Sequence, residues 1–102
     1  MGLKDIIAIK KINKKLENLY CGITDSFVDI TDRVDKNKLD KSAAVEMLEV
    51  VGSSGKDDYA KIKASNTQYE EVFIKADKEF APLFRDIDKR IEKYNNDLGF
   101  TI

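Results

Sequence analysis

The feature that most constrains this fold is the spacing of the large apolar residues, which recur every three or four positions in both halves of the chain. The second half keeps this spacing from Tyr59 to Leu98, with Phe and Tyr at many of the positions. Sustained spacing of this kind is typical of long amphipathic helices. The sequence therefore predicts an all-α protein. The first half shows the same spacing at Ile9, Ile12, Leu16, Leu19, Ile23, Phe27, Ile30 and Val34.

The middle of the chain carries a cluster of small residues, V-V-G-S-S-G at residues 50–55. Gly52 follows an apolar run, as a glycine at a helix C-terminus does. Ser54 and Asp57 have the spacing of an N-terminal capping box. We therefore expect a turn at residues 52–55, built on Gly52 and Gly55. A connection this short makes its two helices antiparallel, so the prediction is a helical hairpin of two long, bent arms.

Additional apolar residues beside the main seam widen the apolar stripe beyond what one partner helix covers. Self-association, helices of another chain, or a compact four-helix bundle would each bury that surplus. The bundle needs breaks near 22–24, 36–40 and 82, where Gly22, a polar run and Pro82 lie. Whether the first arm is one helix or is broken near 22 and 35–40 stays open. In each case residues 1–102 form a single helical domain.

The residue inventory argues against catalysis and metal binding. The chain has no histidine, which is the commonest general base and transition-metal ligand. Its only cysteine, Cys21, is expected to be a buried, inert thiol. Acidic residues alternate with basic ones at i, i+4 spacing, as Glu71 does with Lys75, which suits a solvated helix face. We predict no enzymatic activity, no cofactor and no metal site.

The charges are unevenly distributed although the net charge is −1. Residues 1–20 carry five lysines and two acids, whereas residues 21–58 carry nine acids and five bases. A solvated surface explains this asymmetry better than a nucleic-acid site does, because the lysines are not interleaved with arginine or aromatic residues. No apolar run is long enough for a signal peptide or a membrane span. We expect a cytoplasmic protein, with export without a cleaved signal peptide left open.

Two F-x-x-x-D motifs in the second half are the candidate recognition residues. Phe73 precedes Asp77 by four positions, and Phe84 precedes Asp88 in the same way. On a helix this spacing places an aromatic ring and a carboxylate one turn apart. Such a pair forms either a combined apolar and charged epitope for a partner, or a core phenylalanine beside a solvated aspartate.

In outline the chain resembles the WXG-like small proteins of bacterial type VII secretion, which are helical hairpins of about a hundred residues. Where that family has W-x-G, this chain has V-V-G at residues 50–52. The C-terminal Y-x-x-x-D/E signal is not matched, since Tyr94 is followed by Leu98. The F-x-x-x-D motif is similar to that of the small helical partners of LXG toxins. The resemblance implies that Phe73 and Asp77 contribute an export signal.

This resemblance implies a non-enzymatic adaptor or targeting partner of a larger secreted effector, working through helix-on-helix contacts. The expected partner is that effector, a second small helical protein, or another copy of the chain. An alternative is a small cytosolic immunity protein of the bacteriocin type, which would be a compact helical bundle.

Overall fold

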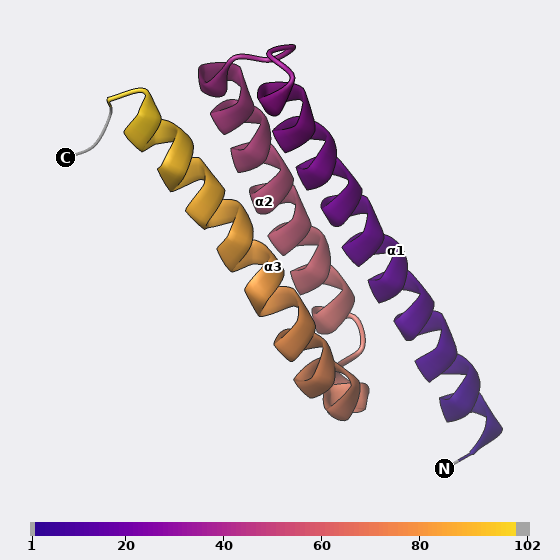
Figure 1. Cartoon of the computed structure of the whole chain (residues 1–102). Helices are drawn as coiled ribbons and strands as arrows, with labels where there is room; N and C mark the ends of the chain where they lie inside the picture. Colours follow the sequence, from indigo (N-terminus) through magenta and orange to yellow (C-terminus); the bar gives the residue numbers. More distant parts are fainter. Residues whose placement is uncertain (1, 100–102) are drawn as a thin grey trace.

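The computed structural model describes residues 2–99 and consists of three α-helices joined by two short connections. Helix α1 spans Leu3–Asp35, α2 spans Lys41–Ala64 and α3 spans Glu70–Asp97. A single 3-10 turn, η1 (Thr67–Tyr69), precedes α3. The chain runs in opposite directions along α1 and α2 and reverses again into α3 (Figure 1). The prediction of an all-α protein is confirmed, and the helices number three in the described chain.

The predicted turn at residues 52–55 is wrong, because α2 passes through this stretch without interruption. Gly52 and Gly55 are both buried, and neither has a positive φ. A Cβ atom on Gly55 would lie 2.7 Å from Cδ1 of Ile23 in α1 and 3.1 Å from Cε1 of Phe84 in α3. The missing side chain lets three helices meet closely at this point. Gly55 thus serves helix packing and not chain reversal.

The structure answers the open question of the first arm, because α1 is continuous at residues 22–24 and the break lies between Asp35 and Lys41. Asn37 adopts a left-handed conformation with φ of 57°, which ends α1. The Lys38 N–H donates to the Arg33 carbonyl at 2.8 Å, as in a Schellman motif. Asp40 then caps α2, since its Oδ1 accepts a hydrogen bond from the Ala43 N–H at 2.8 Å.

The second connection was not expected, because the apolar spacing runs through it. Asn66 ends α2 there. Its Nδ2 donates to the Ile62 carbonyl at 2.7 Å, and its own carbonyl accepts from the Tyr69 N–H at 3.0 Å. Asparagine favours such local hydrogen bonds over helix continuation. The sequence does hold a signal, since residues 65–68 read S-N-T-Q, four polar residues in a row.

Helix α3 forms the C-terminal part of the predicted second arm and is one continuous helix. Pro82 lies inside it, with its side chain exposed to solvent. Gly99 follows the last turn with φ of 82°, as a glycine at a helix C-terminus does.

The molecule is elongated, with extents of 55 × 27 × 17 Å and a radius of gyration of 16.4 Å. A compact domain of this length has a radius of gyration of about 13 Å. Helix α2 makes extensive contacts with both neighbours, whereas α1 and α3 contact each other much less. The gap between α1 and α2 is therefore covered by α3 on one face only.

An aromatic cluster joins the three helices at their common core. Phe80 of α3 lies with its ring centroid 4.6 Å from that of Tyr59 in α2 and 5.4 Å from that of Tyr20 in α1. Edge contacts between rings add to the apolar area that they bury. The buried apolar residues are Ile12, Leu16, Ile23, Ile30, Val34, Ala44, Val45, Leu48, Phe73, Ala76, Phe80, Leu83, Ile87 and Tyr94.

Gly22 offers a direct test of helix continuity. Helix α1 continues through it, and a Cβ atom there would meet nothing within 4 Å. We expect Gly22→Ala to raise the free energy of unfolding by about 0.5–1 kcal/mol, because alanine has the better helix propensity and fills open space. Urea unfolding followed by circular dichroism measures the change. A loss of stability would contradict a continuous α1 at this position.

Candidate partner-binding groove

The first F-x-x-x-D motif faces α2. Phe73 is 1% exposed, and its ring packs edge-on against Tyr59 of α2 at a centroid distance of 6.3 Å. Asp77 accepts a hydrogen bond from the Tyr59 hydroxyl. Lys63, also on α2, places its Nζ 3.1 Å from Oδ2 of Asp77. Both members of the motif therefore contact Tyr59 within the chain, and the Phe73 ring is not accessible from outside.

The second motif also faces α2, about three turns further along α3. Lys56 of α2 lies with its Nζ 5.8 Å from the centroid of the half-buried Phe84 ring. The same Nζ is 3.7 Å from Oδ2 of Asp88, whose side chain is 63% exposed. Both motifs thus help to hold α3 against α2. Their role in binding a partner stays a prediction, and the two carboxylates are more exposed than either ring.

The environment of Asp77 shifts two pKa values in opposite directions. The hydrogen bond from Tyr59 is the main cause that lowers the pKa of Asp77, and Lys63 adds to it, while partial burial opposes both. Burial is the first cause that raises the pKa of Tyr59, followed by the hydrogen bond to Asp77. Asp77 is therefore ionised in the folded protein at neutral pH and holds a structural position between α2 and α3.

We expect Tyr59→Phe to raise the pKa of Asp77 towards its ordinary value, because the phenol that stabilises the carboxylate is gone. A folded-state pKa below the unfolded value of about 4 means that stability falls as the pH drops through that window. The loss of stability on acidification should therefore be smaller in Tyr59→Phe than in the wild type. NMR titration of the Asp77 carboxyl measures the shift. Tyr69→Phe is the control, since the Tyr69 hydroxyl donates to Asp5. An unchanged Asp77 pKa in Tyr59→Phe would contradict this account.

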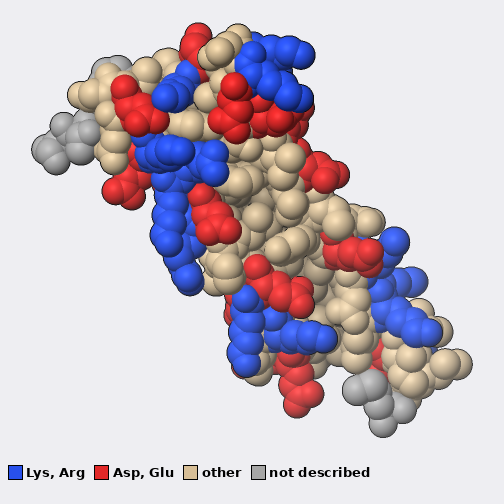
Figure 2. Space-filling model, in the orientation of Figure 1, with Lys and Arg blue, Asp and Glu red and all other residues tan. Residues whose placement is uncertain are grey.

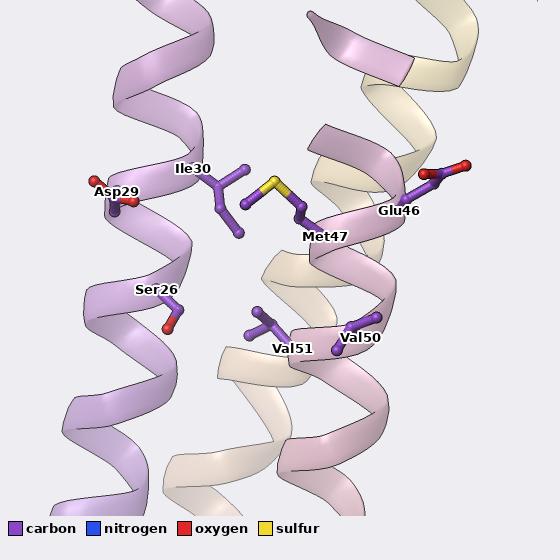
Figure 3. Close-up of a pocket in the computed structure, with 7 residues that line it drawn as sticks. All are labelled: Ser26, Asp29, Ile30, Glu46, Met47, Val50 and Val51. Carbon is purple, nitrogen blue, oxygen red and sulfur yellow. The ribbon is translucent and has the colours of Figure 1, made fainter. Parts of the chain in front are cut away.

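A groove lies between α1 and α2 on the face that α3 leaves open (Figure 3). One hollow of this groove has a volume of about 400 Å³. Figure 3 shows Ile30 of α1 and Met47 of α2 pointing toward each other, with Val51 pointing into the same space. Val50 is 66% exposed and Met47 is 36% exposed. The lining residues are Ser26, Asp29, Ile30, Glu46, Met47, Val50 and Val51.

The groove continues along the two helices toward the N-terminal part of α1. A second hollow, of about 310 Å³, shares Ser26, Val50 and Val51 with the first. Its other lining residues include several small ones, so another helix can approach closely there. They are Asn18, Leu19, Gly22, Ile23, Ser54, Gly55 and Asp58.

The charged residues along this groove are all acidic. Asp29, Glu46 and Asp58 line it, and no lysine or arginine does so among the described residues. Asp29 lies 3.8 Å from Arg33, whereas no ion pair involves Glu46 or Asp58 in residues 2–99. The result is an apolar floor with acidic edges, which suits an amphipathic helix that carries cations beside its apolar stripe.

The sequence places two groove residues incorrectly. The spacing continues the buried seam through Leu39, Ala43, Met47 and either Val50 or Val51. The structure instead buries Ala44, Val45 and Leu48 and leaves Met47 and Val50 exposed, while Val51 is partly buried. The assignment follows the assumption that this stretch has one partner helix. Because α2 contacts both α1 and α3, its buried face lies in a different direction, and Met47 and Val50 are left at the surface.

The described chain offers little chemistry beyond this groove. Cys21 is exposed, so the expectation of a buried thiol is wrong. No cluster of three or more histidine, cysteine or acidic side chains in residues 2–99 could hold a metal ion. Within that range no helix has the length and apolarity needed to cross a membrane.

The groove, the charges around it and the packing of the three helices are the features that bear on function. Comparisons of the chain with protein-family models, with curated proteins and with solved structures find no match.

Proposed function

We propose that this chain is a non-enzymatic protein-binding module whose α1/α2 groove takes an amphipathic helix of another chain. The observation that carries the proposal is the groove itself, with Met47, Val50 and Ile30 on its floor and Asp29, Glu46 and Asp58 at its edges. A bound helix would place apolar residues at i, i+3 or i+4 spacing on the floor. Its lysines or arginines would pair with the acids and set its orientation.

The resemblance to type VII secretion proteins supplies one source for that helix, the helical N-terminal region of a larger secreted effector. The mid-chain turn that supports the resemblance is absent, since α2 spans it. The F-x-x-x-D motifs face α2. Support for an adaptor function comes instead from the open groove, and export stays a prediction.

The bundle architecture favours a second candidate, the immunity-type protein that binds a toxin or its receptor. That alternative expects a helical bundle and not a hairpin, and three packed helices agree with it better than two arms would. Both candidates bind protein and need no reaction chemistry. They differ in the partner that occupies the groove.

Co-purification with matched variants tests the proposal. Val50→Glu puts a carboxylate on the apolar floor at a position that is already exposed, so the fold should survive. We expect it to weaken partner binding by at least about tenfold, because burying an unpaired charge is costly. Ile74→Glu is the control, since Ile74 is 54% exposed and lies on α3.

A stoichiometric partner that is retained by Ile74→Glu and lost by Val50→Glu would support the groove as the binding site. Mass spectrometry then identifies it as a large effector, a small helical protein or a toxin-related component. A partner that binds both variants equally would contradict the proposal.

A further inference from the structure

The first turns of α1 combine exposed apolar residues with unpaired lysines. Leu3, Ile6 and Ile7 are 73%, 43% and 46% exposed. These turns extend past the connection between α2 and α3 (Figure 1). Asp5 is already engaged, because its carboxylate accepts hydrogen bonds from the Tyr69 hydroxyl and the Gly2 N–H. The N-terminal segment, residues 3–15, therefore presents an apolar end and an excess of positive charge.

Its five lysines, at positions 4, 10, 11, 14 and 15, have no ion pair with the described residues. Figure 2 shows basic side chains gathered over the N-terminal half of α1. The second half of the same helix carries four aspartates, at positions 25, 29, 32 and 35. Helix α1 is thus basic at one end and acidic at the other. Two copies placed antiparallel would bring the basic end of one α1 against the acidic end of the other.

The spacing of the groups along α1 matches such an arrangement. Lys4 and Lys15 are eleven residues apart, as are Asn18 and Asp29. Eleven residues span about 16 Å of helix. Asp58 of α2 and Asn18 of α1 line the same part of the groove. An antiparallel second copy with its Lys4 at Asp29 therefore has its Lys15 beside Asp58.

The same register fits the apolar residues. With Lys4 of one copy at Asp29 of the other, Leu3 lies at the level of Ile30 and Ile7 at the level of Ser26. Ile30 and Ser26 both line the groove. The midpoint of the arrangement falls near residues 16–17, so a two-fold axis there makes both contacts at once.

We propose that the N-terminal segment of a second copy of this chain occupies the α1/α2 groove, in a two-fold antiparallel dimer. The inference rests on the proposed function, since it names the partner of the same groove. A stable dimer buries about 800 Å² per partner, so each of the two equivalent contacts would have to supply about half of that area. A lysine-rich amphipathic segment also suits an anionic lipid surface. The second copy is favoured because this chain carries an acidic groove with the matching spacing.

Sedimentation equilibrium of the wild-type protein and of charge-exchanged variants tests the dimer. At low salt the wild type should have twice the monomer mass of 11.6 kDa. Raising the NaCl concentration to about 0.5 M should weaken association, because the contacts are ionic. Lys4→Glu/Lys15→Glu and Asp29→Lys/Asp58→Lys should each be monomeric, because each places like charges together in both contacts. All four side chains are exposed, and circular dichroism verifies the fold.

A mixture of the two charge variants gives the sharpest result. A heterodimer pairs the native lysines of one chain with the native aspartates of the other, and the introduced glutamates with the introduced lysines. We expect dimerisation to be restored in the mixture. Ile74→Glu should remain dimeric, whereas Val50→Glu and Leu3→Ser/Ile7→Ser should dissociate.

Three results would overturn the inference. One is a wild-type monomer at concentrations up to about 0.5 mM. Another is a dimer that persists in every variant of the N-terminal segment and of the groove described above. The third is a monomer that sediments with vesicles of phosphatidylglycerol and phosphatidylcholine, which would assign the segment to a membrane surface. If the wild type is monomeric while Val50→Glu still abolishes binding of another protein, the proposed function stands and the self-association fails.

Discussion

Replacing Gly55 by valine is expected to destabilise the protein by about 3 kcal/mol, because no space exists for a side chain at this position. A Cβ atom there would lie 2.7 Å from Cδ1 of Ile23 and 3.1 Å from Cε1 of Phe84. Valine adds two further methyl groups to the same contact. The helices α1 and α3 must then move apart, which weakens the core on both sides of α2.

Alanine substitutions at the two glycines of α2 form a matched pair. In Gly55→Ala the gain in helix propensity, about 1 kcal/mol, offsets part of the clash, so we expect a net loss of about 1 kcal/mol. In Gly52→Ala the new Cβ would lie 3.5 Å from Cγ2 of Ile87, an ordinary contact. That variant should gain about 0.5–1 kcal/mol. The same substitution, three residues apart in one helix, should therefore change stability in opposite directions.

Ile23→Val identifies the clashing atom, since it removes Cδ1, the atom nearest to the new Cβ. Combined with Gly55→Ala, it should cost less than the sum of the two single variants. Urea unfolding of the four proteins closes the cycle. Additive losses would show that Gly55 is required for some reason other than its contact with Ile23.

These glycines also show why the sequence predicts the fold class but not its topology. The apolar spacing reports helical structure because it depends only on the helical repeat. A glycine pair has two physical uses, a left-handed turn and a close helix approach, and only the neighbours distinguish them. Ile23 and Phe84, the residues that distinguish them here, are 32 and 29 positions away from Gly55.

The connections were predictable to different degrees. The polar residues around Asn37 indicate the end of α1, and Asp40 indicates the start of α2. Both signals depend only on local sequence. The apolar spacing runs past Asn66, because the residues at positions 62 and 69 on either side of it are apolar. Its side chain ends the helix through a bond to the Ile62 carbonyl, which the spacing does not reveal.

The sequence alone does not predict the groove, because contacts between residues far apart in the chain form it. Its residues come from α1 and α2, and their exposure depends on where α3 packs. The apolar surplus of the sequence indicated that a surface of this kind exists. The structure locates part of it at Met47 and Val50.

Replacing Phe73 by alanine is expected to cost about 3–5 kcal/mol, the usual loss for a fully buried phenylalanine. A domain of this size has a free energy of unfolding of about 5–15 kcal/mol, so the variant retains only part of its stability. Phe73 is 1% exposed and packs on Tyr59. The next residue, Ile74, is 54% exposed, and Ile74→Ala should change stability by no more than about 0.5 kcal/mol.

The two members of the first F-x-x-x-D motif can then be separated. If Phe73 acts only in the core, loss of partner binding in Phe73→Ala should follow the fraction of unfolded protein and should be reversed at lower temperature or by a stabilising Gly52→Ala background, since Gly52 does not line the groove. Asp77→Asn keeps the shape of the side chain and removes its charge, so it tests the solvent-exposed member with less damage to the fold. Urea unfolding and partner affinity, measured on the same samples, distinguish the two roles. A Phe73→Ala protein with wild-type stability and no partner binding would make Phe73 a recognition residue, because only direct contact with the partner would then explain the loss.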